Sequence, residues 1–401
     1  MSAVLSPGPV HATSDEAGVE RFIRIRRDIH AHPELAFCEH RTAELVAGLL
    51  SQWGYEVSTG IGGTGVVGQL RRGKGERKLG IRADMDALPI DEQTGRAWSS
   101  KVSGVMHACG HDGHTATLLA AAQALAKQSS FDGTLNLIFQ PAEEGAGGAL
   151  RMMEDGLFQR FPCDAVFALH NMPGIETGRF VFRSGATMAS SDDVTVHLEG
   201  KGGHGAMPHA ATDVIVAASS IVMALQSIVA RNVDPLHTAV VTVGALQAGR
   251  VGNVIPSEAR LELSIRALDP SVRALLRKRV VDVIELQAQS YGVKARVDWR
   301  DGYAVLVNDA RQTAFATSVA KRLFGDERVE AEGPRLTASE DFAFMLEKVP
   351  GCYFFVGNGA SGTPGGCMVH NPGYDFNDSI IDPASRFWVA LTEEFLAPAA
   401  R

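Results

Sequence analysis

Segment 106–114 is the part of the chain best suited to chemistry, because it holds His107, Cys109, His111 and His114 within eight residues. Thiolate and imidazole groups are good ligands for zinc and similar divalent ions. Cys109 and His111 lie two positions apart, which puts them on the same side of an extended segment. Two glycines between these side chains allow tight turns. The segment predicts a metal site, for which the rest of the chain must supply more ligands and a catalytic group.

Other polar residues directly follow predicted strands. The strands expected at 79–83, 134–139 and 164–169 lead into Asp84 and Asp86, Glu143 and Glu144, and His170. Ligands of a parallel sheet bind beyond the carboxyl ends of its strands. We therefore expect these side chains on one rim, within reach of the Cys109–His111 loop. A further histidine, His370, lies in a turn-rich loop near the C-terminus.

Each of these residues has a simpler interpretation when taken alone. A histidine at a strand end is commonly structural, a Glu-Glu pair is commonly a solvated loop, and a single cysteine is commonly a core residue. Their coincidence on one rim favours metal binding. His107 and His114 exceed the ligands needed and are expected to support metal-bound groups. His30 and His32 end a predicted helix and are expected to be surface or capping residues.

The elements that must position these residues alternate between helix and strand. The pattern predicts helices at 16–31, 40–53, 113–127, 146–155, 309–324 and 383–396, and strands at 65–70, 79–83, 134–139 and 164–169. Such alternation is typical of an α/β fold with a mostly parallel sheet.

The middle of the chain follows a different order. Strand 194–198, helix 212–230, strands 238–245 and 260–267, helix 270–291 and strand 293–299 give the β-α-β-β-α-β pattern of a ferredoxin-like domain. We therefore expect a catalytic α/β domain, residues 1–186 and 303–401, interrupted by an inserted α+β domain at 187–302.

Composition narrows the function classes. The 401 residues are 45% hydrophobic and 21% charged, as in an ordinary globular protein with a large core. A net charge of −8 argues against non-specific nucleic-acid binding. Five scattered cysteines predict no disulfide framework and favour a reduced, cytoplasmic location. We expect no signal peptide at 1–18 and no membrane-spanning stretch.

Several motifs, in order along the chain, together resemble one known family. They are Asp84-Met85-Asp86-Ala87-Leu88-Pro89, Cys109-Gly110-His111-Asp112-Gly113-His114, Gln140-Pro141-Ala142-Glu143-Glu144-Gly145, Leu169-His170, the segments 200–209 and 252–256, Ser339-Glu340-Asp341-Phe342 and His370-Asn371-Pro372. The chain resembles the metal-dependent aminoacylase and carboxypeptidase family. It is most similar to the branch of bacterial N-acyl-amino-acid amidohydrolases, or hippurate hydrolases, and plant auxin-conjugate hydrolases.

The resemblance implies two divalent metal ions (Mn, Zn, Co or Ni), and Cys109 would bridge them in place of the aspartate used by other branches. The implied ligands are Cys109, His111, Glu144, His170 and His370. Asp84 would not bind metal, and Asp86 would orient a ligand.

The resemblance also implies roles for the inserted domain, as a lid and as a dimerisation domain. His204 would reach the site, in many members from a partner subunit, and Asn253 would line the same cleft. Arg266 is a candidate partner for a substrate carboxylate, which suits its bidentate geometry. A homodimer or a tetramer is expected, with a small-molecule substrate and no nucleic-acid or membrane partner.

The expected reaction is hydrolysis of an N-acyl amino acid to a carboxylic acid and a free amino acid. If Glu144 coordinates metal, the adjacent Glu143 points elsewhere and is free to act as general base toward a metal-activated water. A dipeptidase and an N-acetyl-diaminopimelate deacetylase are alternatives on the same scaffold. More distant alternatives are a thiol hydrolase that uses Cys109 as nucleophile and a binding protein without turnover.

Overall fold

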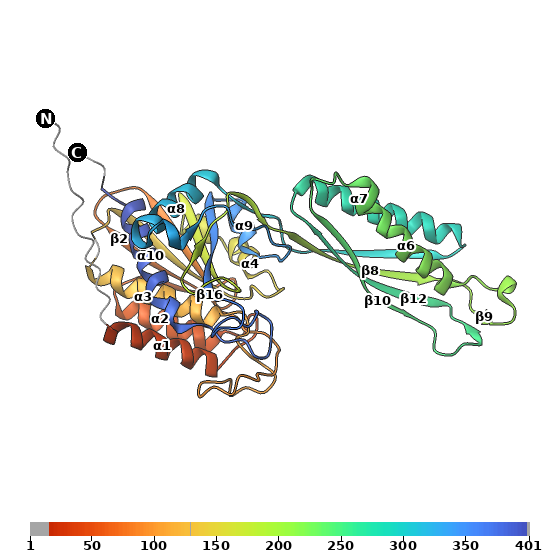
Figure 1. The fold of residues 1–401 in the computed structure, drawn as a ribbon, viewed down its shortest axis with the longest axis horizontal. Helices are drawn as coiled ribbons and strands as arrows, with labels where there is room; N and C mark the ends of the chain where they lie inside the picture. The colour runs from red at the N-terminus through yellow and green to blue at the C-terminus, as the bar shows by residue number, and fades with distance from the viewer. Residues whose placement is uncertain (1–15, 129, 399–401) are drawn as a thin grey trace. The chain divides into compact units, whose positions relative to one another are not determined.

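A computed structural model describes residues 16–128 and 130–398, so most of the segment in which no signal peptide is expected lies outside the described residues. The chain forms two compact units, whose elements are labelled in Figure 1. The first unit combines the residues up to Phe182 with Arg311–Glu332 and the segment from Val349 onward. The second unit combines Arg183–Ala310 with Gly333–Lys348.

The first unit is built on an eight-stranded sheet with the order β1-β2-β4-β3-β5-β16-β6-β15. Its strands are β1 (Glu56–Ile61), β2 (Gly65–Arg72), β3 (Lys78–Asp84), β4 (Gly133–Gln140), β5 (Ala165–Pro173), β6 (Phe180–Val181), β15 (Val329–Glu330) and β16 (Gly351–Gly359). The central strands β4, β3, β5 and β16 run parallel, whereas β1 and β2 join antiparallel. The predicted α/β class with a mostly parallel central sheet is confirmed.

Helices pack on this sheet and enclose its core. They are α1 (Glu16–Ala31), α2 (His40–Gln52), α3 (His111–Gln128), α4 (Gly148–Glu154), α5 (Leu157–Arg160), α8 (Ala310–Phe324) and α10 (Ile381–Phe395), with short 3₁₀ turns at Asp326–Arg328 and Asp378–Ile380. Helix α3 contacts both α1 and α10, and Figure 1 shows these helices near one another. Leu137, Phe167, Phe354 and Trp388 belong to the shared core.

Four strands of this sheet, the outer β1, the two-residue β6 and β15, and the central β16, were not predicted from the sequence. Every residue of β16 is buried, so its apolar and polar residues do not alternate. Strand β4 is buried at every residue too and was predicted, but β16 also has glycine, a residue depleted in strands, at three of its nine positions. The sheet therefore has a central strand that the pattern does not reveal.

The second unit contains an antiparallel sheet with the order β10-β12-β8-β13, with two helices packed on it. The elements are β8 (Ser190–Glu199), α6 (Val214–Asn232), β10 (Ala239–Ala248), β12 (Glu258–Ala267), α7 (Pro270–Ser290) and β13 (Lys294–Asp301). This is the β-α-β-β-α-β order expected for the insert. Asp213 and Asp269 cap the two helices by accepting hydrogen bonds from their first backbone N–H groups.

The second unit is larger than the range 187–302 expected for the insert. Strand β7 (Gly185–Met188) pairs with β14 (Leu306–Asn308), and the backbone N–H of Ala189 donates to the carbonyl of Leu336. Helix α9 (Phe342–Leu346) contacts β14. These contacts join segments that are far apart in sequence. The local sequence pattern therefore could not predict the full extent of this unit.

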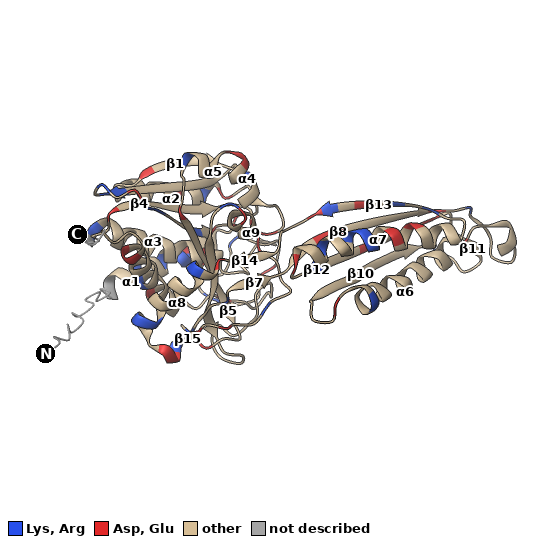
Figure 2. Ribbon diagram, turned by 90° about the horizontal axis from the view of Figure 1, so that it is seen from above, with Lys and Arg blue, Asp and Glu red and all other residues tan. Residues whose placement is uncertain are grey.

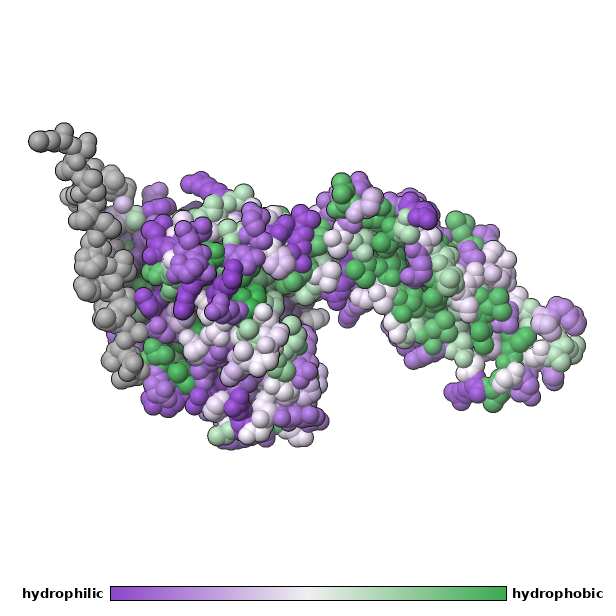
Figure 3. Space-filling view, viewed as in Figure 1, coloured by the Kyte–Doolittle hydropathy of each residue, from purple (hydrophilic) through white to green (hydrophobic). Residues whose placement is uncertain are grey.

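Helix α6 is apolar on more than one face. By length and composition alone it could span a membrane, contrary to the expectation that no stretch could, yet its Ala217, Ile221 and Leu225 pack into the core of the second unit. Figure 2 shows charge on α6 only near one end, and Figure 3 shows apolar surface over this helix. Ile215, Val216 and Met223 remain exposed on it.

Candidate metal centre

The Cys109–His111 loop leads directly into helix α3, which begins at His111. Gly110 between them has φ +92°, and a Cβ there would lie 2.3 Å from Asn171 Nδ2 and 2.4 Å from Tyr374 Oη. Only glycine fits this conformation and this approach. The loop is also tied to the C-terminal region, because the backbone N–H of His370 donates to the carbonyl of Ala108 over 2.7 Å.

The structure brings the five proposed ligands together in the first unit. Ligand atoms of Cys109, His111 and His170 lie within 4.8 Å of one another, as do those of Cys109, Glu144 and His370. Cys109 Sγ is 3.3 Å from His170 Nε2, and His370 Nε2 is 3.1 Å from Glu144 Oε1. Cys109 belongs to both groups, which is the arrangement that a bridging ligand requires.

Asp86 fixes two of these groups at once. Its Oδ1 lies 3.1 Å from His111 Nδ1, and its Oδ2 accepts a hydrogen bond from the backbone N–H of Glu144 over 2.9 Å. His111 is fully buried, and among the described residues its Nε2 has no hydrogen-bond partner. A buried ring nitrogen without a partner is costly unless an ion or water fills the position. The geometry of His111 therefore fits a metal ligand.

Negative charge dominates the surroundings of these ligands. Burial by itself lowers the pKa of His111. The neighbouring carboxylates of Asp84, Asp86 and Glu144 have the opposite effect and raise this pKa to about 10. Burial raises the pKa of the Cys109 thiol, and Glu144 and Glu143 raise it further. A set of donors in which carboxylates outweigh cations suits a divalent ion, which would offset their mutual repulsion.

Asp84 is engaged elsewhere. It lies 2.7 Å from an Arg82 guanidinium nitrogen and 2.6 Å from His114 Nδ1. The other ring nitrogen of His114 accepts a hydrogen bond from the backbone N–H of Asn171. Both residues thus support the loops around the ligands, although Asp84, His111 and His114 also form a group of ligand-type atoms.

His170 lies within β5, and not beyond the end of the strand as predicted from the sequence. The strand extends to Pro173, and His170 pairs with Phe355 of β16. His170 Nδ1 lies 2.6 Å from the carbonyl of Asn171, so the proton of the neutral ring sits on Nδ1. Nε2 then presents its lone pair toward Cys109, and burial lowers the pKa of His170 well below the usual value.

The Glu143–Glu144 pair follows a strained residue. Ala142 has φ +55°, one of three positive values among the non-glycine residues described, the others being Phe37 and His370. Such conformations cost of order 1–3 kcal/mol and cluster at functional sites. Glu143 is buried, and its carboxylate lies in one group with His111 and Glu144.

His370 and its loop complete the cluster. The residue has φ +62° and a half-exposed side chain, in contrast to the buried Cys109, His111 and His170. The bond from its backbone N–H to Ala108 fixes it beside the Cys109 loop.

The three residues expected to contact substrate lie in the second unit. His204 in β9 (Gly203–His204) pairs with Val254 in β11 (Val254–Ile255), which directly follows Asn253. The structure thus brings His204 and Asn253 together. Arg266 is the second-last residue of β12 (Glu258–Ala267), and its guanidinium donates to the Thr337 carbonyl over 3.2 Å.

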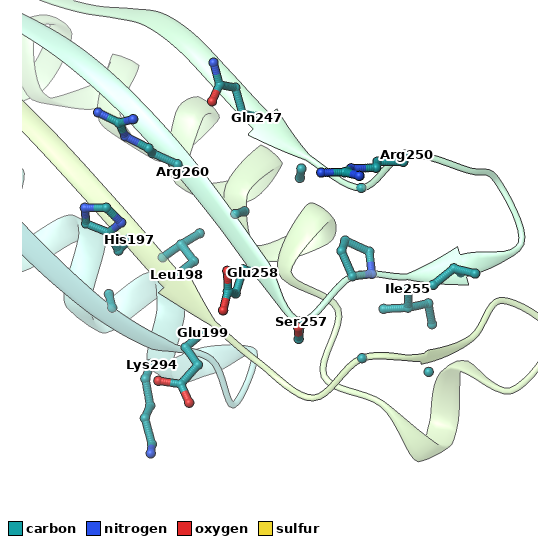
Figure 4. Close-up of a pocket in the computed structure, with 18 of the residues that line it drawn as sticks. His197, Leu198, Glu199, Gln247, Arg250, Ile255, Ser257, Glu258, Arg260 and Lys294 are labelled. Atoms are coloured by element: carbon teal, nitrogen blue, oxygen red, sulfur yellow. The ribbon is translucent and has the colours of Figure 1, made fainter.

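An open depression of about 1280 Å³ also lies in the second unit (Figure 4). Its lining mixes basic residues, including Arg250, Arg260 and Lys294, with Glu199 and Glu258. It contains none of the proposed ligands, so it is separate from the candidate metal centre.

His30 is not the surface or capping residue that the sequence suggested. It is fully buried, with Nδ1 2.8 Å from Asp112 and Nε2 3.3 Å from Glu92. His32, by contrast, is partly exposed and bonds the carbonyl of Asp28 at the helix end. The spacing of Arg26 and His30, one helical turn apart beside buried Phe22 and Ile29, is the signal that could have revealed a buried polar face.

His107 is buried, and burial lowers its pKa to about 4. Neither of its ring nitrogens has a hydrogen-bond partner among the described residues. Its ring centroid lies 6.2 Å from that of His30, and His107 is not among the groups of ligand atoms.

Comparisons with known proteins agree with this geometry. The chain is 46% identical over 375 residues to hippurate hydrolase of Campylobacter jejuni, covering 94% of this chain and 96% of the relative. It is 39% identical to N-acetyl-L-cysteine deacetylase of Bacillus subtilis, covering 92% and 86%. A crystal structure of the Bacillus subtilis YXEP protein, described as a dinuclear metal-binding peptidase from the M20 family, superposes with a TM-score of 0.82 at 33% identity, covering 95% and 99%.

The family model described as peptidase family M20/M25/M40 matches residues 80–394. This range contains Asp86, Glu143 and each of the five proposed ligands. The resemblance inferred from the motifs is confirmed, and the chain belongs to peptidase family M20/M25/M40.

Proposed function

We propose that this protein is a metal-dependent amidohydrolase that cleaves N-acyl amino acids to a carboxylic acid and a free amino acid. The observation that carries the proposal is the cluster of Cys109, His111, Glu144, His170 and His370 with a separate carboxylate, Glu143, beside it. Hippurate and N-acetyl amino acids are the substrate class suggested by the names of the two curated relatives.

The donor set suits two divalent ions, with Cys109 shared between the groups that contain His111 and His170 on one side and Glu144 and His370 on the other. Mixed sulfur, nitrogen and oxygen ligands suit zinc, manganese, cobalt or nickel. Divalent ions, when bound, lower the pKa of a water molecule from ~15.7 toward about 7 and polarise a carbonyl group.

Residues of the chain then transfer the proton of the attacking water and keep the ligands in place. Glu143 takes a proton from the attacking water and delivers it to the leaving amine nitrogen, as a general base and acid. The C–N bond breaks as the amine leaves, and the acyl group departs as a carboxylate. Asp86 keeps both His111 and Glu144 in place during these steps.

His204 is suited to stabilise the oxyanion that forms on the amide carbonyl. Its Nδ1 accepts a hydrogen bond from the backbone N–H of Ala206 over 3.0 Å. The proton of the neutral ring therefore sits on Nε2, which is a donor. Loss of one oxyanion donor typically costs ~10²–10³ in rate. Asn253 and Arg266 are proposed to contact the substrate, Arg266 through its carboxylate.

The thiol-hydrolase alternative is disfavoured by the surroundings of Cys109. Nucleophilic cysteines lie in electropositive, partly exposed places that lower their pKa. Cys109 is buried, and burial together with Glu144 and Glu143 raises its pKa. Its chemistry fits a metal ligand better than a nucleophile.

We further propose a homodimer formed by the second unit. Strand β10 is at the edge of its sheet, and the neighbouring helix α6 exposes Ile215, Val216 and Met223. Exposed strand edges and apolar faces of this kind are commonly covered by a second copy.

All five cysteines are free, which supports a reduced, cytoplasmic location.

The test is a substrate screen on one sample whose metal content is measured. The panel contains hippurate, N-acetyl, indole-acetyl and N-acetyl-diaminopimelate substrates, and dipeptides. We expect release of a free amino acid from acyl amino acids, loss of turnover with a chelator, and recovery with Mn, Zn, Co or Ni. Chelator-insensitive turnover that iodoacetamide abolishes would support the thiol mechanism instead. Binding without turnover would indicate a binding protein.

A further inference from the structure

Glu39 has a buried carboxyl group that does not cap the helix that it precedes. It stands at the N-cap of α2, where its carbonyl accepts from the backbone N–H of Ala43, yet its side chain makes no cap hydrogen bond. The residue is 0% exposed. Burying a carboxyl group without adequate hydrogen bonds is expensive, so its contacts inside the protein deserve an explanation.

The Glu39 carboxyl reaches the turn that carries the Glu143–Glu144 pair. One oxygen, Oε1, accepts a hydrogen bond from the backbone N–H of Ala142 over 2.9 Å. The other oxygen accepts from the hydroxyl of Thr64, which lies in the turn between β1 and β2. Thr64 is itself buried, so this hydrogen bond is shielded from water.

Ala142 needs such a contact because its backbone is in the left-handed region, at φ +55°. Alanine has no side-chain group to compensate for the clash between its Cβ and the backbone. The surrounding bonds must therefore fix this conformation: Glu39 holds the N–H of Ala142, and the N–H of Gly148 donates to the Ala142 carbonyl over 2.9 Å. If the first bond is lost, the peptide is free to relax toward an unstrained conformation.

The direction of Glu143 depends on this peptide. Glu143 directly follows Ala142, and the next residue is held by the bond from the Glu144 N–H to Asp86 over 2.9 Å. Two carboxyl groups, from Glu39 and Asp86, thus hold the backbone immediately before and after Glu143. Rotation at Ala142 would redirect Glu143, whereas the bond from Asp86 would keep Glu144 in place.

We propose that Glu39 is a positioning residue for Glu143: it holds the peptide of Ala142 in the left-handed conformation that aims the Glu143 carboxylate. The proposal rests on the proposed function, in which Glu143 is the general base. Glu39 lies before residue 80, where the match to the family model begins, and it contacts none of the five proposed ligands in the bonds described above.

The test compares Glu39→Leu, Ala142→Gly and the double variant, with metal content, melting temperature, kcat and KM measured for each. A displacement of about 1 Å at a reacting group can cost ~10²-fold, so Glu39→Leu should lower kcat ~10- to 100-fold. Metal content should stay at the parental value, and KM should change less than about threefold because substrate contacts are retained.

The double variant separates positioning from a general structural role. Glycine adopts a positive φ without strain, so the turn no longer needs Glu39 to hold it. Glu39→Leu/Ala142→Gly should therefore recover ~5- to 30-fold in kcat over Glu39→Leu, the factor that corresponds to the strain relieved at a left-handed alanine. A loss of folding or packing would not be reversed by this substitution.

Glu34→Leu is the matched control, because Glu34 lies in the same segment, and its carboxyl group accepts hydrogen bonds from the backbone N–H groups of Arg41 and Thr42 instead of from the Ala142 turn. It should keep the parental kcat. If Glu39→Leu melts below the assay temperature, Thr64→Val carries the test. It removes only the hydroxyl that holds Glu39 and should lower kcat at least ~3-fold, with recovery by Ala142→Gly.

Four results would overturn the proposal: parental kcat in a folded Glu39→Leu or Thr64→Val, no recovery in the double variant, a loss of kcat that follows a loss of metal, or an equal loss in Glu34→Leu. Failure of the proposed function looks different. A metal-loaded parent that hydrolyses no acyl amino acid removes the premise and overturns both.

Discussion

At the scale of single residues, the candidate site depends on side chains that bind no substrate. Asp86 is the clearest case, since one carboxylate orients the His111 ring and also holds the backbone of Glu144. Both of its partners are proposed metal ligands. Its contribution is therefore expected in metal affinity before it is expected in the chemical step.

Asp86→Asn should weaken metal binding ~10- to 100-fold, the usual effect of removing a group that orients a ligand. Equilibrium dialysis with metal analysis measures this directly. Asp91→Asn is the control, because Asp91 is exposed and accepts a hydrogen bond only from the Gly104 N–H among its described contacts. Equal metal affinity in the parent and in Asp86→Asn would contradict the role of Asp86.

At the scale of elements, a buried ionic network joins α1 to the loops around the site. Arg26 is fully buried and lies 2.8 Å from Asp112 at the start of α3 and 2.7 Å from Asp375 in the loop after His370. His30, one turn later on α1, contacts the same Asp112. Helix α1 thus connects the two loops that supply Cys109, His111 and His370.

Arg26→Met should lower the free energy of unfolding by about 3–5 kcal/mol, because it leaves buried carboxylates without their cation. Urea denaturation of the metal-free protein measures the change without a contribution from metal binding. Arg24→Met, on the exposed side of the same helix, should change it by less than ~0.5 kcal/mol. If Arg26→Met lowers the free energy of unfolding by less than about 1 kcal/mol, the ionic network does not stabilise the fold as proposed.

Some elements of the site could be predicted from the sequence, whereas others depend on contacts between distant segments. Cys109, His111, Glu143 and Glu144 could be singled out because ligand-type residues crowd short loops after recognisable elements. The left-handed Ala142 and the role of Glu39 could not, since alanine carries no signal for a positive φ and the two residues are 103 positions apart in sequence. Strand β16 was not predicted because glycine, which is depleted in strands, occupies three of its nine positions.

At the scale of the whole molecule, the proposed dimer is formed through helix α6 of the second unit and the edge strand β10. Met223 is 72% exposed on α6, the helix that packs against the edge strand β10. Met223→Glu should shift the protein from dimer to monomer in sedimentation velocity, because it places a charge in an apolar interface. Leu286→Glu is the control: it is similarly exposed but lies on α7, which packs toward β13. Unchanged sedimentation of Met223→Glu would contradict this interface.

A mixing experiment shows which subunit supplies His204. His204→Ala and Glu143→Gln should each be inactive alone. If His204 serves the partner's site, random mixing gives half heterodimers with one intact site each, so about a quarter of parental activity returns. No recovery after subunit exchange would mean that His204 serves its own chain.

The central claim is that a cluster of metal ligands works with Glu143 as a separate general base. Glu143→Gln keeps the size of the side chain and removes its capacity to take a proton. The decisive measurement is kcat for hippurate and an N-acetyl amino acid, with metal content determined on the same sample. We predict a fall of ~10²–10⁴ in kcat with parental metal content. Near-parental turnover by the metal-loaded variant would contradict the account.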